Sequence, residues 1–514
     1  MSQSLIHLLQ HQAHRVPDNI AIVQKDERIS YGQLYACICA VAAFLRENGL
    51  APGARVGLLL ENSPQFVATY YGVLAAGGVV VAMNTGTKSR DLVNWLKHSE
   101  ACWLFADARH PELAAITTQM RDSIAYVIVG EHPNGSAITV GASWKQIQEN
   151  GAVNEPDLSY SGQPGELASI IYTSGTTGHP KGVMLSHGNL FHNVNSIVGY
   201  LKLTGDDIVM NILPFYYSYG NSVLHTHLAV GATIVLENSL LYPHKILQTM
   251  EKERVTGFSG VPSTFSILLS RTKFKDYDLS SLRYITQAGG PMAPASIRRV
   301  IADLPNAEFF VMYGQTEATA RLSYLPPDKL EQKLGSVGIG IPGVTLEVQD
   351  DQGNKVAPGE IGQIYAKGDN IMLGYWKDPQ TTETVIQNGW LVTGDLAYQD
   401  SDGFIFINGR ASDMIKSGAN RISPKDIEEV IAELEGVEEV AVVGIPDEIL
   451  GQVIKAFVVA SPNAKLEKKA VMAHCRQNLA IYKLPKEVEF VSELPKTASG
   501  KVKRFLLADT ARAS

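Results

Sequence analysis

Between two apolar runs, the chain carries the segment Thr173-Ser174-Gly175-Thr176-Thr177-Gly178-His179-Pro180-Lys181-Gly182. One apolar run spans 167–172 and the other begins at residue 183, which predicts a strand, a loop and a second strand. Glycines let backbone N–H groups approach an anion closely, hydroxyls donate hydrogen bonds, and the lysine supplies positive charge. The segment therefore predicts a loop that binds a polyphosphate.

A loop of the Walker A type is one alternative, but its pattern G-x-x-x-x-G-K-[ST] does not fit. Lys181 is followed by Gly182 instead of serine or threonine, Pro180 precedes it, and no helical pattern begins there. A surface turn is a second alternative, because turns rich in glycine and threonine are common. The lysine and the serial hydroxyls favour phosphate binding over such a turn.

Length and composition bound the class of protein. With 514 residues the chain should contain two or more domains, and 45% apolar with 19% charged residues is typical of a soluble globular protein. The net charge of −8 argues against general binding to nucleic acid or to an anionic membrane. We expect no membrane span, because no apolar run reaches the roughly 18 residues that one needs.

The N-terminal segment and the cysteines point to the cytoplasm. Residues 1–17 are typical of an amphipathic helix capped by Ser4 and lack the basic and apolar regions of a secretion signal. The four cysteines and thirteen histidines show neither a disulfide framework nor metal-ligand spacing. We therefore expect a cytoplasmic protein without a zinc site.

The order of apolar and amphipathic patterns indicates an α/β fold. From about residue 20 to 400, short β-rich runs alternate with helical stretches, as in the strand pattern 56–60 and the helix pattern 66–76. Continuous apolar strands that alternate with helices are typical of parallel sheets covered on both faces. We expect a large N-terminal domain of parallel-type sheets and helices over 1–408, with a small β-rich subdomain at about 335–408.

The pattern changes again after residue 408. A helix, two strands, a helix and a strand are predicted at 424–434, 437–443, 455–460, 468–479 and 487–491. This order indicates a small α+β C-terminal domain over 414–514, which is a normal domain size. Residues 409–413 would join the two domains.

Five further segments, together with the loop at 173–182, resemble the motifs of adenylate-forming enzymes. They are Gln287-Ala288-Gly289-Gly290-Pro291, Tyr313-Gly314-Gln315-Thr316-Glu317, Gly389-Trp390-Leu391-Val392-Thr393-Gly394-Asp395, Gly409-Arg410-Ala411-Ser412-Asp413-Met414-Ile415-Lys416 and Pro495-Lys496-Thr497-Ala498-Ser499-Gly500-Lys501. This superfamily comprises acyl- and aryl-CoA synthetases, stand-alone adenylation domains and firefly luciferase. Because all six segments occur in the family's order, the chain is identified as a member.

The resemblance implies an acid–thiol ligase that uses ATP and Mg²⁺. Such enzymes join a carboxylate to ATP, release pyrophosphate and pass the acyl group of the acyl-AMP to a thiol. The β- and γ-phosphates would be held by Thr173, Ser174, Gly175, Thr176, Thr177 and Lys181. Thr316 would hydrogen-bond the α-phosphate, and Glu317 would bind Mg²⁺, a hard cation that prefers carboxylate and phosphate oxygens.

The nucleoside part of ATP would be held by the remaining motifs. Asp395 would accept both ribose hydroxyls, since an ionised carboxylate offers two acceptor oxygens, and Arg410 would add a charged contact there. Tyr313 would stack on adenine. The glycines and the amide expected beside these groups are Gly289, Gly290, Gly314 and Gln315.

Catalysis of the adenylation step is assigned by the resemblance to Lys501, with Thr316 and Glu317. The ammonium of Lys501 would bridge the carboxylate and the α-phosphate and neutralise the charge that develops there. The C-terminal domain would be mobile and would swing about the hinge at 409–413 between the two half-reactions.

After this swing, the thiol channel would be lined by Lys416, Gly418 and Ala419. The thiol would belong to CoA or to the phosphopantetheine arm of a carrier protein. Two positions depart from the family's pattern: Ser412 stands where the hinge commonly has Asp or Lys, and Ala419 stands where glycine is usual. These departures concern the acceptor more than the adenylation.

The acid is expected to be a fatty or aryl acid. Amino-acid-activating relatives carry an aspartate near the segment that reads 213–221 here, and this segment has no carboxylate to pair with a buried ammonium. Candidate pocket residues are Tyr217, Asn221, Val261 and Gly314, the last because it leaves space that acetate-specific relatives fill. The alternative is that the aromatic residues pack in the core.

Three functions follow from these motifs. The first is an acid–CoA ligase, and the second is a ligase that loads a separate acyl carrier protein. The third, from another class, is a non-catalytic protein that binds acyl-AMP or a nucleotide, and the intact Lys501, Glu317 and Asp395 argue against it. A luciferase-like oxygenation is a further alternative that the motifs favour less than either ligase. The partners are a small carboxylic acid and the thiol carrier, and the family favours a monomer or a homodimer.

Overall fold

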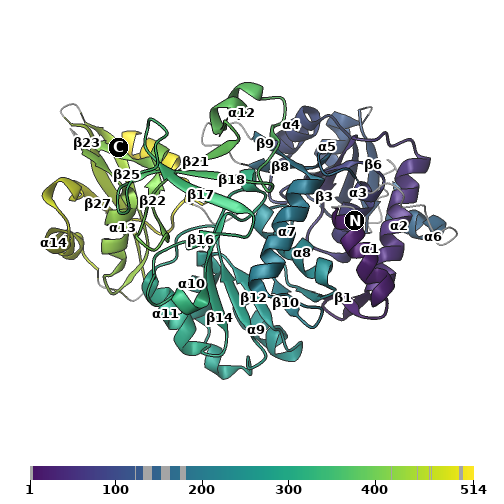
Figure 1. Cartoon of the computed structure of the whole chain (residues 1–514), viewed down its shortest axis with the longest axis horizontal. Coiled ribbons are helices and arrows are strands. Elements are labelled where there is room, and N and C mark those ends of the chain that lie inside the picture. The colour runs from purple at the N-terminus through teal and green to yellow at the C-terminus, as the bar shows by residue number, and fades with distance from the viewer. Residues whose placement is uncertain are drawn as a thin grey trace.

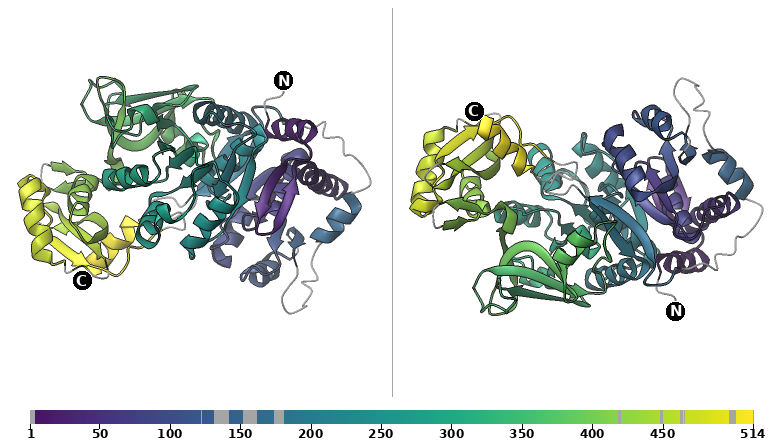
Figure 2. Two further views of the ribbon diagram at one scale, coloured as in Figure 1. Left: turned by 90° about the horizontal axis from the view of Figure 1, so that it is seen from below. Right: turned by 90° about the horizontal axis from the view of Figure 1, so that it is seen from above.

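The computed structural model describes residues 4–121, 123–130, 142–151, 162–173, 181–417, 420–447, 450–461, 464, 466–496 and 502–513. Ser174 to Thr177, Gly418, Ala419 and Lys501 lie outside the described residues. The described parts form four β-sheets with helices packed around and between them (Figure 1). The C-terminal elements, drawn in yellow, lie at one end of the molecule and the N-terminal ones at the other (Figure 2).

A nine-stranded sheet has a parallel centre. Its spatial order is β16 (Ile339–Gly340), β15 (Ser323–Leu325), β14 (Glu308–Tyr313), β13 (Tyr284–Gln287), β12 (Gly257–Gly260), β10 (Ile208–Asn211), β11 (Thr233–Leu236), β1 (Ile20–Gln24) and β2 (Glu27–Ser30). Strands β10, β12, β13 and β14 are parallel, whereas β2, β15 and β16 run antiparallel. The prediction of parallel strands is thus confirmed for the centre of the sheet, whereas the strands at its edges are antiparallel. A parallel connection needs a crossover of about a dozen residues or more, and segment 314–322 is too short.

An eight-stranded sheet carries the strands that flank segment 174–180. Its order is β19 (Gly374–Tyr375), β9 (Lys181–Ser186), β8 (Leu167–Thr173), β4 (Val79–Ala82), β3 (Arg55–Leu59), β5 (Ala101–Asp107), β6 (Ala125–Val129) and β7 (Ala142–Ser143). The two strands predicted around segment 174–180 are confirmed as β8 and β9. They pair antiparallel, with Thr173 opposite Lys181.

Two smaller sheets follow in the chain. The first is antiparallel and consists of β17 (Val344–Gln349), β18 (Gly362–Gly368), β21 (Trp390–Gln399), β20 (Ile386–Gln387) and β22 (Ile405–Arg410). The second consists of β24 (Asn420–Ile422), β23 (Ile415–Ser417), β26 (Gly451–Ala460), β25 (Val437–Asp447) and β27 (Glu487–Phe490). The predicted β-rich segment and the C-terminal order of helices and strands are confirmed, and the exact domain boundaries stay a prediction.

Several of the helices carry start signals in the sequence, either a capping side chain or a proline in the first turn. The helices are α1 (Leu5–Arg15), α2 (Tyr31–Glu47), α3 (Pro64–Ala75), α4 (Ser89–Ser99), α5 (Leu113–Met120), α6 (Trp144–Gly151), α7 (His187–Leu201), α8 (Ser218–Val230), α9 (Pro243–Lys252), α10 (Pro262–Arg271), α11 (Pro294–Asp303), α12 (Pro379–Val385), α13 (Pro424–Ala432), α14 (Lys468–Asn478) and α15 (Arg504–Ala513). Ser4 caps α1 as predicted, and a capping box of Ser186 and Asn189 starts α7 directly after β9. Among the described residues, no helix is both long and apolar enough to cross a membrane.

The largest core cluster joins the two large sheets through helices. It contains Leu58 of β3, Val209 of β10, Val194 of α7 and Leu224 of α8, all buried. Helices α7 and α8 accordingly lie between the two sheets (Figure 1). Since each sheet buries one face against these helices, their positions are fixed from both sides.

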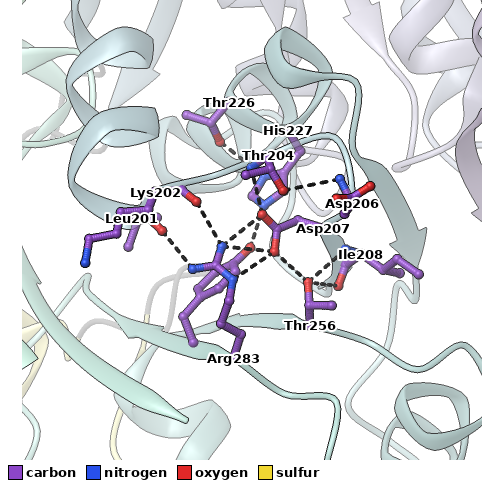
Figure 3. Close-up of polar contacts among 11 residues, drawn as sticks. Leu201, Lys202, Thr204, Asp206, Asp207, Ile208, Thr226, His227, Thr256 and Arg283 are labelled. Atoms are coloured by element: carbon purple, nitrogen blue, oxygen red, sulfur yellow. Dashed lines mark hydrogen bonds and ion pairs between the residues drawn. The ribbon is translucent and has the colours of Figure 1, made fainter. Parts of the chain in front are cut away.

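A buried ion pair lies at the amino ends of the parallel strands (Figure 3). Asp207, just before β10, is 3% exposed and accepts hydrogen bonds of 2.9 Å from both Arg283 and Thr256. The Arg283 guanidinium lies 4.8 Å from the ring centre of Tyr284, whose hydroxyl is 2.6 Å from Nε2 of His227. A buried charge is costly unless it is paired. The network therefore fixes the starts of β10, β12 and β13 relative to one another.

Three histidines of α7 and α8 are buried without charge. Burial lowers the pKa of His187 and His227 to about 4 and that of His225 to about 3. An unfolded histidine has a pKa of about 6.5, so below that pH the unfolded chain binds protons that the folded chain excludes. This contribution to stability is complete above about pH 6.5 and is lost as the pH falls toward about 4, at about 1.4 kcal/mol per pH unit for each histidine.

The substitution His227→Gln should reduce this pH dependence. We expect its urea midpoint to fall less steeply than that of the parent between about pH 6.5 and pH 4.5, since one proton-excluding group is gone. At pH 7 the variant should be less stable, because it loses the contact with Tyr284. The exposed His11 provides the control His11→Gln, which should keep the parent slope. An unchanged slope in His227→Gln would contradict the account.

Candidate functional site

The motif residues gather at one edge of the nine-stranded sheet. Strands β10, β12, β13 and β14 are parallel neighbours, so their carboxyl ends meet there. The segments that leave these ends carry Tyr217, Val261, Gly289 and 314–317. In open α/β sheets, ligands bind in the crevice outside the carboxyl ends of the strands. Four segments that are far apart in the sequence thus form one candidate site.

The two glycines after β13 form a tight, exposed turn. Gly289 has φ +87°, a conformation that favours glycine, and a Cβ built on it would lie 3.0 Å from Cγ1 of Val261. Gln287 closes the turn, since its Nε2 donates to the carbonyl of Gly290 at 2.8 Å. The turn therefore leaves backbone accessible next to Val261, and its contact with a flat base stays a prediction.

A buried carboxylate connects two sheets at this edge. Tyr313, at the end of β14, donates from its hydroxyl to Oδ2 of Asp395 on β21 at 2.6 Å. Nε of Arg410 lies 3.0 Å from Oδ1 of Asp395, and the two residues face each other in the β21–β22 pair. Asp395 is 5% exposed, whereas 43% of the Arg410 side chain is exposed. Three separately predicted residues therefore meet.

The Asp395 carboxylate stabilises the protonated forms of Tyr313 and Arg410. Burial and the Asp395 carboxylate hold the pKa of the Tyr313 hydroxyl well above its ordinary value. The same carboxylate raises the pKa of the Arg410 guanidinium. Tyr313 is therefore a constant donor and Arg410 a constant cation. A carboxylate has about four acceptor positions, so Asp395 keeps capacity for hydroxyl groups of a ligand.

Thr316 and Glu317 lie on a single 3-10 turn, Thr316–Ala318. The Thr316 hydroxyl lies 3.2 Å from Oγ of Ser218, the first residue of α8. Glu317 is half-buried, and its Oε1 accepts a 2.8 Å hydrogen bond from the Tyr375 hydroxyl. Both side chains are thus held by partners that the sequence did not identify.

Gly314 lies where the backbone after β14 folds back closely on itself. A Cβ built on it would lie 2.1 Å from the carbonyl oxygen of Ala320. Backbone fills the direction that a side chain at Gly314 would take, so the glycine allows segment 314–320 to fold back tightly. The space that Gly314 would leave for an acyl group stays a prediction.

Gln315 provides an unused donor at the site. Its Nε2 is buried and has no hydrogen-bond partner among the described residues. A buried donor without an acceptor costs about 1–3 kcal/mol. A ligand with an acceptor at this point would remove that cost, which supports Gln315 as a ligand-binding residue.

Lys181, at one end of the predicted phosphate loop, is linked to the Glu317 carboxylate through Tyr375. Thr173 and Lys181 face each other where β8 and β9 pair. Nζ of Lys181 lies 5.0 Å from the ring centre of Tyr375, whose hydroxyl reaches Glu317. Ser174, Gly175, Thr176 and Thr177 lie outside the described residues.

Two residues predicted to line the acid pocket, Tyr217 and Asn221, lie in different environments. Tyr217 is half-buried, and its hydroxyl accepts from Nδ2 of Asn84 at 3.1 Å. Asn221 is 3% exposed, and its Oδ1 lies 3.0 Å from Nε2 of His225, whose Nδ1 contacts the Tyr71 hydroxyl at 2.8 Å. Asn221 therefore fits the alternative of core packing, while Tyr217 stays a candidate for the pocket.

The predicted thiol channel is described only at its first residue. Lys416 on β23 is exposed, and its backbone N–H donates to Oε1 of Gln452 at 2.7 Å. Gly418, Ala419 and the predicted catalytic Lys501 lie outside the described residues.

Comparison with known proteins identifies the class. Residues 9–376 match the AMP-binding enzyme family and residues 426–501 match the AMP-binding enzyme C-terminal domain. The long-chain-fatty-acid–CoA ligase of Bacillus subtilis is 31% identical, covering 99% of this chain and 94% of the relative. The indoleacetate–CoA ligase of Aromatoleum aromaticum is 33% identical, covering 95% of this chain and 94% of the relative.

A solved structure has the same overall fold. The o-succinylbenzoate coenzyme A synthetase of Bacillus subtilis, in complex with ATP and magnesium ion, superposes with a TM-score of 0.85 at 27% identity, covering 97% of this chain and 98% of the other. Fold and site thus define an adenylate-forming enzyme. The chain belongs to the AMP-binding enzyme family, and its likeness to CoA ligases and synthetases confirms the expectation of an acid–thiol ligase.

The Asp395 cluster can be tested by ATP binding. Asp395→Asn keeps the size of the side chain but removes the charge that faces Arg410, and we expect the Kd for ATP to rise about tenfold or more. Isothermal titration calorimetry without an acid substrate measures this directly. The exposed Asp351 supplies the control Asp351→Asn, which should bind ATP like the parent. Equal affinity in Asp395→Asn would exclude Asp395 from the nucleotide site.

Proposed function

We propose that the protein activates a fatty or aryl acid with ATP and transfers the acyl group to CoA. The observation that carries this proposal is the meeting of Tyr313, Asp395 and Arg410 beside Thr316 and Glu317 at the carboxyl edge of the sheet. The related enzymes named for long-chain fatty acids and for indoleacetate support both classes of acid.

The residues present fit a magnesium ion bound together with ATP. The described residues contain no group of three or more His, Cys, Asp or Glu that could hold a metal. Mg²⁺ is usually bound by one or two carboxylates plus substrate phosphates, and Glu317, whose Oε1 is held by Tyr375, supplies one such carboxylate. The ion would reduce the repulsion between the triphosphate and the incoming carboxylate.

In the first half-reaction, a carboxylate oxygen of the acid attacks the α-phosphorus and pyrophosphate leaves. Thr316 is proposed to hydrogen-bond the α-phosphate, and Asp395 to accept the ribose hydroxyls. Tyr313 would lie against adenine, and the loop from Thr173 to Lys181 would hold the leaving phosphates. Preorganised contacts of this kind lower the barrier because they are in place before charge develops.

In the second half-reaction, the thiol of CoA attacks the acyl carbonyl, AMP leaves and a thioester forms. We propose that the C-terminal domain moves about 409–413 between the two steps and brings Lys416 toward the thiol. The short turn Ala411–Asp413 between β22 and β23 lies at this position. A cytoplasmic monomer or homodimer with a role in fatty-acid metabolism completes the proposal.

Pyrophosphate release across a panel of carboxylic acids tests the function. We expect release with long-chain fatty acids or aryl acids, none with α-amino acids, and an acyl-CoA product when CoA is present. Glu317→Gln should lower this rate about 10²–10³-fold, because it removes a preorganised charge. Release without any acyl-CoA product would favour a carrier protein as acceptor, and no release with any acid would favour the non-catalytic alternative.

Lys501 separates the two half-reactions experimentally. Lys501→Ala should lose acyl-AMP formation by about 10²–10³-fold, as expected for one lost transition-state contact. It should keep thioester formation from supplied acyl-AMP. Lys503→Ala removes a neighbouring lysine and is the control. Normal pyrophosphate release by Lys501→Ala would exclude this role.

A further inference from the structure

Segment 369–376, named here the strap, connects the Glu317 turn to β9. On one side, the backbone N–H of Met372 donates to the Glu317 carbonyl at 2.9 Å. Nδ2 of Asn370 donates to the carbonyl oxygens of Ala318, at 3.2 Å, and Arg321, at 2.8 Å. The strap therefore fixes the backbone of the turn and of the segment that follows it.

On its other side, the strap is bound to the strand that follows the phosphate loop. The N–H of Leu373 donates to the Met184 carbonyl at 2.9 Å, and the N–H of Trp376 donates to the Gly182 carbonyl at 2.7 Å. These bonds make β19 an edge strand of the eight-stranded sheet. The strap thus holds both β9, the strand that follows the phosphate loop, and the turn that carries Glu317.

One side chain of the strap, that of Tyr375, contacts both Glu317 in the turn and Lys181 at the start of β9. Tyr375 is 6% exposed, and its hydroxyl donates to Oε1 of Glu317 at 2.8 Å. The face of its ring lies 5.0 Å from Nζ of Lys181. No motif used in the sequence analysis includes this tyrosine.

We propose that Tyr375 is a positioning residue that orients the Glu317 carboxylate for the metal ion bound to ATP. This inference rests on the proposed function. A glutamate side chain loses considerable rotamer freedom when it is fixed, and Mg²⁺ demands near-ideal octahedral geometry. Because the Tyr375 hydroxyl holds Oε1, it restricts rotation of the Glu317 carboxylate, and the remaining acceptor positions of that carboxylate would be available to the ion.

The substitution Tyr375→Phe tests this role, because it removes the hydroxyl and keeps the ring beside Lys181. We expect the free Mg²⁺ concentration that half-saturates ATP binding to rise about tenfold, as is usual when a partner of a metal-binding side chain is lost. Isothermal titration calorimetry with ATP at a series of Mg²⁺ concentrations gives this value without turnover. The variant should still unfold cooperatively without ligand, at a temperature only modestly below that of the parent, because a single hydrogen bond is lost.

Two further variants make the experiment specific. Tyr398→Phe changes a tyrosine that stacks on Phe406 and should keep the parent Mg²⁺ dependence. In Glu317→Gln, where the metal carboxylate is gone, adding Tyr375→Phe should have no further effect on Mg²⁺ dependence. Such non-additivity is expected only when one residue acts through the other.

The outcomes separate the two proposals. A parent-like Mg²⁺ dependence in Tyr375→Phe, with an impaired Glu317→Gln, overturns the positioning role and leaves the proposed function intact. An equal effect of Tyr375→Phe with and without Glu317 also overturns it, because Tyr375 then acts elsewhere. A parent-like dependence in Glu317→Gln overturns the metal assignment itself.

Discussion

The candidate site depends on one buried negative charge, the carboxylate of Asp395. A buried carboxylate is stable only with partners, and its partners come from two sheets: Tyr313 ends β14 of the large sheet, and Arg410 lies on β22 of the small one. The small sheet can therefore dock on the large one in few ways. The ion pair at Asp207 lies at the opposite ends of the parallel strands and connects strands within the large sheet. Between these two fixed points, the segments after β12 and β13 are brought to a common edge.

The strap gives this edge a second connection. Its backbone bonds reach Glu317 in one direction and Gly182 in the other. The residues expected to hold phosphates and metal therefore belong to one hydrogen-bonded unit, although they come from different sheets. Pre-positioned polar groups are what stabilises developing charge most effectively, because no reorganisation is needed during the reaction. The tight turn at Gly314 contributes to this, since it places Thr316 next to the start of α8.

Local sequence predicted much of this fold. The strands on either side of segment 174–180, helix α1 with its Ser4 cap and the C-terminal order of elements follow from periodicity and capping, which are local signals. The antiparallel edges were missed because pairing partners are set by loop length and distant strands. At the site, motifs identified Asp395, Tyr313 and Arg410 separately, but not their contact. Tyr375 and Ser218 carry no local signal, since their roles depend on hydrogen bonds to residues 58 and 98 positions away.

Helix α8 links the candidate site to the buried core, and the two differ in their electrostatics. Its first residue, Ser218, contacts Thr316, whereas Asn221 and His225 form a buried chain with Tyr71 one turn further on. Burial lowers the pKa of His225 to about 3, so this chain is neutral at physiological pH. A buried polar group is tolerated when it is hydrogen-bonded and uncharged, which this chain satisfies. The charged side chains Asp395, Arg410 and Glu317 thus lie at the carboxyl edge of the sheet, whereas the chain of Asn221, His225 and Tyr71 belongs to the uncharged core behind it.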